Sequence, residues 1–147
     1  MSSPDLTIAT RYTRSLCRHA NKHNLGNTMS SIKPPHHDND TPYVQIYPFF
    51  DADHLASFAR WLPTLANVVV TVTAEDSQNL HLLATGAMDD DTLTGVVVLP
   101  HGTDRELVEA NCHPVVGNEI PVELLLRLVS AAVAESRTDT TALAGAS

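Results

Sequence analysis

The stretch of sequence that decides the fold is residues 68–99, VVVTVTAEDSQNLHLLATGAMDDDTLTGVVVL. It contains two runs rich in β-branched and apolar residues, Val68–Thr73 and Leu80–Ala87, separated by a polar segment of hairpin-loop length. Three successive aspartates, residues 89–91, mark a solvated turn before a third apolar run, Gly95–Leu99. The pattern predicts three strands, of which the first two form an antiparallel hairpin.

Further elements extend this unit on both sides. Tyr43–Phe50 (YVQIYPFF) is predicted to be a strand and residues 53–65 a helix, with Trp61 at the margin of its buried face and Pro63 distorting or ending it. A short helix is predicted at 105–110 and a long apolar one from Pro121 to about Arg137. We therefore expect an α+β fold, in which a small mixed or antiparallel sheet (strands near 43–50, 68–73, 80–87 and 95–99) packs against helices near 53–65 and 121–137.

The N-terminal segment has the periodicity of a basic amphipathic helix. Its apolar residues fall on one face, and its basic residues, Arg11, Arg14, Arg18 and Lys22, are centred on the opposite face. Such a helix is typical of membrane-surface binding, partner binding or an organellar presequence. Met29 offers a second plausible start. An equally weighted alternative to a functional helix is therefore that residues 1–28 are a disordered tail or an over-extended reading frame.

Composition divides the chain into four parts. Residues 1–28 are expected to form a basic arm, residues 29–42 a linker rich in Pro, His and Asp, residues 43–137 a single α+β domain, and residues 138–147 a flexible tail. The linker contains prolines at 34, 35 and 42. Because proline removes a backbone donor and restricts φ, we expect no regular structure there.

Charge is distributed unevenly along the chain. Residues 1–33 carry five basic residues and one acidic residue, whereas the remainder carries four basic and sixteen acidic residues. An acidic body argues against nucleic-acid binding except through the N-terminal arm. No apolar run reaches the roughly 20 residues that a membrane span needs, and the two cysteines, Cys17 and Cys112, suggest no disulfide framework. We expect a soluble, cytoplasmic protein.

Several polar groups are candidate sites. His101, Cys112 and His113 are the best candidates in the body for a metal site or a nucleophile, but they lack the paired close spacings of a structural zinc site. His36, His37 and Asp38 lie in the linker, Asp51 and Asp53 are more simply helix caps, and residues 89–91 lack the ligand pattern of an EF-hand. Phosphate loops, GxSxG elbows and HExxH pairs are missing. We therefore predict no catalytic residues and no cofactor.

One resemblance reaches specific residues. The order of elements over residues 43–133, with Ala84-Thr85-Gly86 ending a leucine-rich strand and Ile120-Pro121-Val122 opening a helix, resembles the first half of a bacterial DNA-polymerase processivity-clamp domain. Gly86 stands where that family has an acidic residue, and an insertion over 100–118 intervenes. The resemblance implies a ring-forming DNA-replication accessory.

The leading hypothesis from the sequence is a non-catalytic protein-interaction or assembly module that binds another protein or itself. It rests on a predicted open sheet edge and on the broad apolar face of the last helix, where we expect contacts through Leu125, Leu128, Val129 and Val133. Two alternatives stay open, which are the clamp-like replication accessory and a small metal-dependent enzyme that uses His101, Cys112 and His113.

Overall fold

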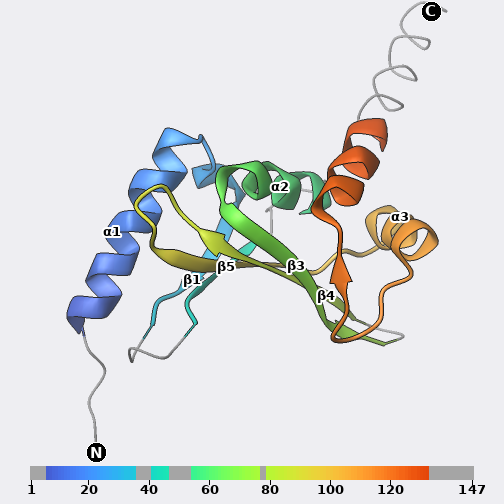
Figure 1. Cartoon of the computed structure of the whole chain (residues 1–147), viewed down its shortest axis with the longest axis horizontal. Helices are drawn as coiled ribbons and strands as arrows, with labels where there is room; N and C mark the ends of the chain where they lie inside the picture. Colours follow the sequence, from blue (N-terminus) through green and yellow to red (C-terminus); the bar gives the residue numbers. More distant parts are fainter. Residues whose placement is uncertain (1–5, 36–40, 47–53, 77–78, 133–147) are drawn as a thin grey trace, which may run out of the picture.

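The computed structural model of the 147-residue chain describes residues 6–35, 41–46, 54–76 and 79–132. Its centre is a six-stranded sheet with the order β1-β2-β5-β4-β3-β6 (Figure 1). β2 and β5 are parallel, and the other neighbouring strands are antiparallel. With helices packed on this mixed sheet, the predicted α+β class is confirmed.

The four predicted strands are present. They are β2 (Tyr43–Ile46), β3 (Ala66–Glu75), β4 (Leu80–Ala87) and β5 (Leu93–Val98). β3 and β4 form the predicted antiparallel hairpin, in which Val70 lies opposite Ala84. Residues 47–50, the second half of the first predicted strand, lie outside the described residues.

Two strands were not predicted. β1 (Met29–Lys33) lies inside the segment expected to be an irregular linker, and it pairs with β2 just before the two prolines begin. β6 consists of Glu119–Ile120, just before the predicted helix that starts at Pro121, and pairs with β3. β1 is mostly exposed and β6 has only two residues, so neither shows a hydrophobic alternation in the sequence. Both are strands because they pair with neighbouring strands of the sheet.

The helices largely follow the predicted positions. They are α1 (Leu6–Lys22), α2 (His54–Trp61), α3 (Thr103–Cys112) and a C-terminal helix over residues 122–132, with short 3-10 helices η1 (Gly26–Thr28) and η2 (Leu62–Thr64). As predicted, the regular helix ends near Pro63: α2 ends at Trp61, and the 3-10 helix η2 begins at Leu62. Trp61 is fully buried rather than marginal. Positions 53 and 133–137 of the predicted helices lie outside the described residues.

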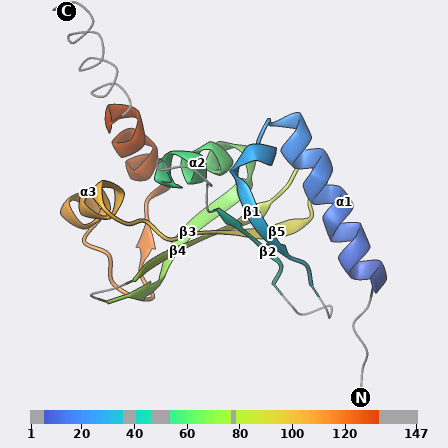
Figure 2. The same ribbon diagram turned by 180° about the vertical axis from the view of Figure 1, so that it is seen from behind.

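The helices that the structure describes contribute to one core on one face of the sheet. Side chains alternate along β4 between buried and half-buried, so that every second residue points toward the helices. The inward residues of the strands form one cluster with Leu16 of α1, Phe58 of α2, Val108 of α3 and Leu125 of the C-terminal helix. Figures 1 and 2 show these helices on the same side of the sheet, which leaves a two-layer structure.

α1 belongs to this core. Tyr12, Leu16 and Ala20 are at most 2 % exposed, and the Tyr12 hydroxyl lies 2.6 Å from the Thr94 hydroxyl on β5. The helix ends in a Schellman motif, in which the N–H of Leu25 donates to the carbonyl of Ala20 and Asn24 takes a left-handed conformation (φ 57°). The chain therefore turns sharply after α1 and leads into η1 and β1.

One capping expectation was wrong. Thr103 and Asp104 precede the predicted helix at 105–110 and were both cap candidates, but α3 begins at Thr103, and Gly102 occupies the N-cap position without a side-chain cap. The Asp104 carboxylate instead accepts a hydrogen bond from the backbone N–H of Leu55, in the first turn of α2, at 3.2 Å. This carboxylate therefore connects two helices that are distant in the sequence. Asp51 and Asp53 lie outside the described residues.

Candidate functional site

The three residues proposed for metal or nucleophile chemistry do not form a cluster. His101 is exposed in the loop before α3, and its ring centroid lies 4.6 Å from that of His54. Cys112 ends α3 half-buried, and burial raises the pKa of its thiol. His113 is exposed just after the helix at φ 48°. Of the described residues, only a different trio brings three such ligand atoms together.

The proposed contact residues of the C-terminal helix are mostly used by the core. Leu125 is fully buried, and Val129 packs against the core cluster. Leu128 is half-buried, and Val133 lies outside the described residues. This helix therefore leaves less apolar surface for a partner than its sequence suggests.

The four basic residues of α1 are all exposed, on the side opposite Tyr12 and Leu16. Arg11, Arg14 and Arg18 line a surface hollow together with threonines 7 and 10 of the same helix. The candidate ligands His36, His37 and Asp38 lie outside the described residues.

The second face of the sheet, which we call the open face, carries no helix among the described residues (Figures 1 and 2). The registers of the strand pairs bring six outward residues together at its centre, namely Tyr43, Gln45, Val97, Leu83, Thr85 and Thr71. All six are uncharged and half-buried. Several of them line a hollow of ≈ 470 Å³ together with Thr73, His81 and Leu99.

The charges of the open face lie at its two edges. At the β1 edge, Lys33 lies opposite Tyr43 in the register, and its ammonium is 5.9 Å from the centre of the Tyr43 ring. At the β6 edge, Glu119 lies opposite Thr71 and is exposed. The open face therefore has an uncharged centre, one positive edge and one negative edge.

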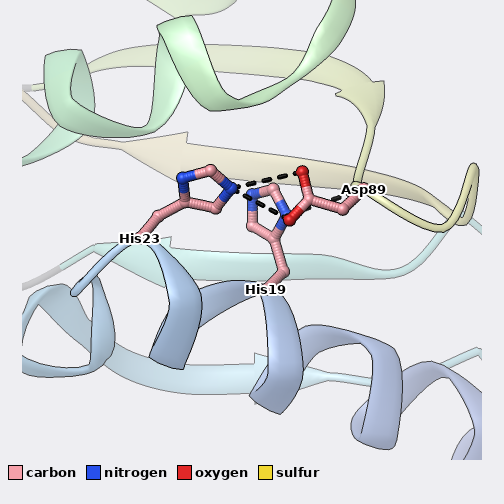
Figure 3. A group of neighbouring side chains, drawn as sticks. All are labelled: His19, His23 and Asp89. Carbon is pink, nitrogen blue, oxygen red and sulfur yellow. Dashed lines mark hydrogen bonds and ion pairs between the residues drawn. The ribbon is translucent and has the colours of Figure 1, made fainter.

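A second candidate site lies on the helical side, where α1 ends beside the turn between β4 and β5. His19 and His23 are four residues apart at the end of α1, so their rings project from the same side of the helix. Both face the carboxylate of Asp89, the first acid of the predicted solvated turn (Figure 3). One potential ligand atom of each of the three residues lies within 4.8 Å of the other two, and Asp89 Oδ2 lies 3.4 Å from His19 Nδ1 and 2.9 Å from His23 Nε2.

Hydrogen bonds determine the tautomer of His19. Thr64 donates its hydroxyl proton to the Trp61 carbonyl (2.6 Å), so its oxygen accepts from His19 Nε2 at 2.9 Å. The backbone N–H of Asp89 donates to His19 Nδ1 at 3.3 Å. Neutral His19 therefore carries its proton on Nε2 and has a lone pair on Nδ1, and this lone pair lies 3.4 Å from the Asp89 carboxylate.

The surroundings also determine which groups are charged. Burial lowers the pKa of the His19 imidazole, and this effect outweighs the opposing charge of Asp89. Partial desolvation acts to raise the pKa of Asp89, but it still lies below its ordinary value because of the hydrogen bond from His23 and the nearby charges of His19, His23 and Lys22. His23 Nε2 lies 2.9 Å from Asp89 Oδ2, and Lys22 Nζ lies 3.5 Å from it. The site thus combines a neutral imidazole with an ionised carboxylate.

Sequence reasoning missed both sites. The His-x3-His spacing in RHANKH (residues 18–23) was an available signal, since the segment was already predicted to be helical. Nothing in the sequence, however, placed the Asp89 turn beside the end of that helix. The open face needed the strand order and the side of the sheet on which the helices pack.

Comparison with known proteins adds no identification, because no family model, curated protein or solved structure matches the chain significantly. The resemblance to a processivity clamp thus has no support beyond the residues that suggested it. Within the residues that the structure describes, no helix is both long and apolar enough to span a membrane.

Proposed function

We propose that this chain is a non-catalytic assembly module that forms a two-fold symmetric dimer through the open face of its sheet. The observation that carries the proposal is the half-buried, uncharged centre of that face, where Tyr43, Leu83 and Val97 lie side by side without a helix over them among the described residues. Sheets commonly pack face to face at about 10 Å, with side chains of both inner faces interdigitating.

The edge charges favour a second copy of the same chain as the partner. A two-fold axis that lies between two such faces and runs parallel to the strands sets the β1 edge of one copy over the β6 edge of its partner. Lys33 of each copy then faces the Glu119 edge of its partner, which gives two equivalent attractive contacts. Face-to-face contact in this orientation is complementary in charge as well as in polarity.

A pair of leucine substitutions tests which surface assembles. Leu83→Glu introduces a charge at the centre of the open face, and we expect it to give a monomer in size exclusion with light scattering. Leu128→Glu is the matched control on the half-buried side of the C-terminal helix, and we expect it to leave the dimer intact. Dissociation by Leu128→Glu but not by Leu83→Glu, with both variants folded by circular dichroism, would assign the interface to the helix and overturn the proposal.

A further inference from the structure

We propose that His19, His23 and Asp89 form a binding site for a divalent transition-metal ion of the Zn²⁺ type. The ligands are Nδ1 of His19, Nε2 of His23 and a carboxylate oxygen of Asp89. Two imidazoles and one carboxylate suit Zn²⁺, Co²⁺, Ni²⁺ and Cu²⁺ rather than Ca²⁺ or Mg²⁺, which prefer oxygen ligands. This site lies on the helical side of the molecule and is independent of the open face.

The distances between the ligand atoms fit such an ion. With metal–ligand bonds of about 2.0–2.1 Å in a tetrahedral site, neighbouring ligand atoms lie about 3.3 Å apart. His19 Nδ1 and Asp89 Oδ2 are 3.4 Å apart, and His23 Nε2 is 2.9 Å from the same oxygen. One ligand atom of each residue already lies within 4.8 Å of the other two. On binding, the ion replaces the hydrogen bond from the Asp89 backbone N–H to His19 Nδ1, and His23 takes the tautomer with its proton on Nδ1, which frees the Nε2 lone pair.

The buried ligand is already oriented from behind. Metal-binding histidines generally donate their second ring N–H to an oxygen, which fixes the tautomer and the ring orientation. His19 does this with Thr64, whose hydroxyl is itself directed by its hydrogen bond to the Trp61 carbonyl. The His19 ring also stacks on Trp61, with ring centroids 6.0 Å apart. The Nδ1 lone pair is therefore held toward Asp89 before any ion binds.

The electrostatics of the site also favour a cation. The Nδ1 lone pair, which accepts a hydrogen bond from the backbone N–H of Asp89, and the Asp89 carboxylate are two acceptors 3.4 Å apart, and an ion bound to both would add an attraction to each. The Lys22 ammonium already places a positive charge beside Asp89, but the Lys22 side chain is 68 % exposed and can move into solvent when an ion binds. The neighbouring Asp90 is held by hydrogen bonds from Ser15 and from the backbone N–H of Thr92, so it is not counted as a ligand.

The position of the site predicts both an open coordination position and a structural effect. His23 and Asp89 have side chains that are 26 % and 38 % exposed, so water can reach the fourth position. The ligands join the end of α1 to the β4–β5 turn, which lies about 66 residues further along the chain. A bound ion therefore connects the two segments and stabilises the folded chain by linkage.

The test uses the full chain, prepared free of metal and without a histidine tag. We expect isothermal titration with Zn²⁺ to show one ion per chain, Co²⁺ to give the visible absorption of a low-coordinate nitrogen and oxygen site, and Zn²⁺ to raise the melting temperature. His23→Gln and Asp89→Asn each remove one ligand near the surface, and we expect each to weaken Zn²⁺ binding by at least about tenfold and to abolish the thermal shift.

His113→Asn is the matched control, because it removes an exposed imidazole at a left-handed position that asparagine tolerates. We expect it to bind Zn²⁺ like the unmodified chain. The proposal is overturned if the unmodified chain binds no Zn²⁺, if both ligand variants bind as tightly as the unmodified chain, or if His113→Asn loses as much affinity as they do. Repeating the titration on Leu83→Glu separates this result from the state of the dimer, because that variant retains all three ligands.

Discussion

Gly86 illustrates how a single residue position allows two segments to meet. A Cβ added to this buried glycine of β4 would lie 2.9 Å from the Leu65 Cβ and 3.1 Å from the Ala66 carbonyl oxygen, where η2 joins β3. Because the neighbouring atoms belong to the backbone or lie next to it, they cannot easily move. We expect Gly86→Ala to lower the free energy of unfolding by about 1–3 kcal/mol, as overpacking does elsewhere, measured by urea denaturation.

Gly26→Ala provides the control for that measurement. A Cβ at Gly26 meets no atom within 4 Å, so this substitution is expected to change the free energy of unfolding by less than about 0.5 kcal/mol. Equal effects of the two substitutions would show that the close approach at Gly86 is not what requires glycine there.

Tyr12 joins α1 to the sheet through a buried hydroxyl pair. Thr94 donates its proton to the Gly95 carbonyl, so the Tyr12 hydroxyl donates to Thr94. We expect Tyr12→Phe to cost about 1 kcal/mol of unfolding free energy. Tyr43→Phe removes the same group from a half-buried side chain and is expected to cost less. A loss for Tyr12→Phe no larger than that for Tyr43→Phe would contradict this assignment.

The same hydroxyl makes stability depend on pH. Burial raises the pKa of Tyr12 above its ordinary value of 10.0, although the hydrogen bond with Thr94 opposes this. The unfolded chain therefore releases this proton first, and the contribution of Tyr12 is full below pH 10 and is lost as the pH rises through the folded-state pKa. We expect the free energy of unfolding to fall more steeply above pH 10 in the unmodified chain than in Tyr12→Phe. Parallel curves would exclude this contribution.

At the scale of elements, removing α1 tests whether the folding unit includes this helix or begins after it. Its residues Tyr12, Leu16 and Ala20, with Leu25 after it, belong to the core cluster, so a chain that starts at Met29 leaves part of the core uncovered. We expect this shortened chain to lack a cooperative urea transition and to bind a hydrophobic dye. A sharp transition with native near-ultraviolet dichroism would instead show that residues 29–132 fold without the helix.

The elements also show which parts of the fold the sequence predicts. Apolar alternation in LHLLATGA and the β-branched run before it predict β4 and β3, because each strand carries its own pattern of burial. β1 and β6 carry no such pattern, since pairing with β2 and β3 defines them. The parallel pairing of β2 with β5 joins segments about 50 residues apart, and local sequence contains no information on that contact.

The two candidate sites depend on the same tertiary information. The helical spacing of His19 and His23 is local, whereas their contact with Asp89 depends on α1 packing beside the β4–β5 turn. The open face likewise follows from the strand order and from the packing of the described helices on the opposite side. Leu125 was predicted to contact a partner, but it is fully buried in the core. An apolar stripe at helical spacing predicts core and interface equally well until its neighbours are known.

At the scale of the whole molecule, the proposed dimer predicts a charge-swap effect. Lys33→Glu or Glu119→Lys alone places like charges at both contacts between copies, and we expect each to weaken self-association. The double variant restores opposite charges and should recover most of the affinity. Single variants that associate as well as the unmodified chain, or a double variant no better than either, would exclude this orientation of the two faces.

The measurement that tests the central claim most directly is sedimentation equilibrium of the unmodified chain over a wide range of concentration. The proposal predicts a concentration-dependent approach to twice the chain mass of 15.9 kDa, with no larger species, because a two-fold contact between open faces closes on itself. A mass that stays at 15.9 kDa up to the highest soluble concentration would contradict it, and so would growth beyond the dimer.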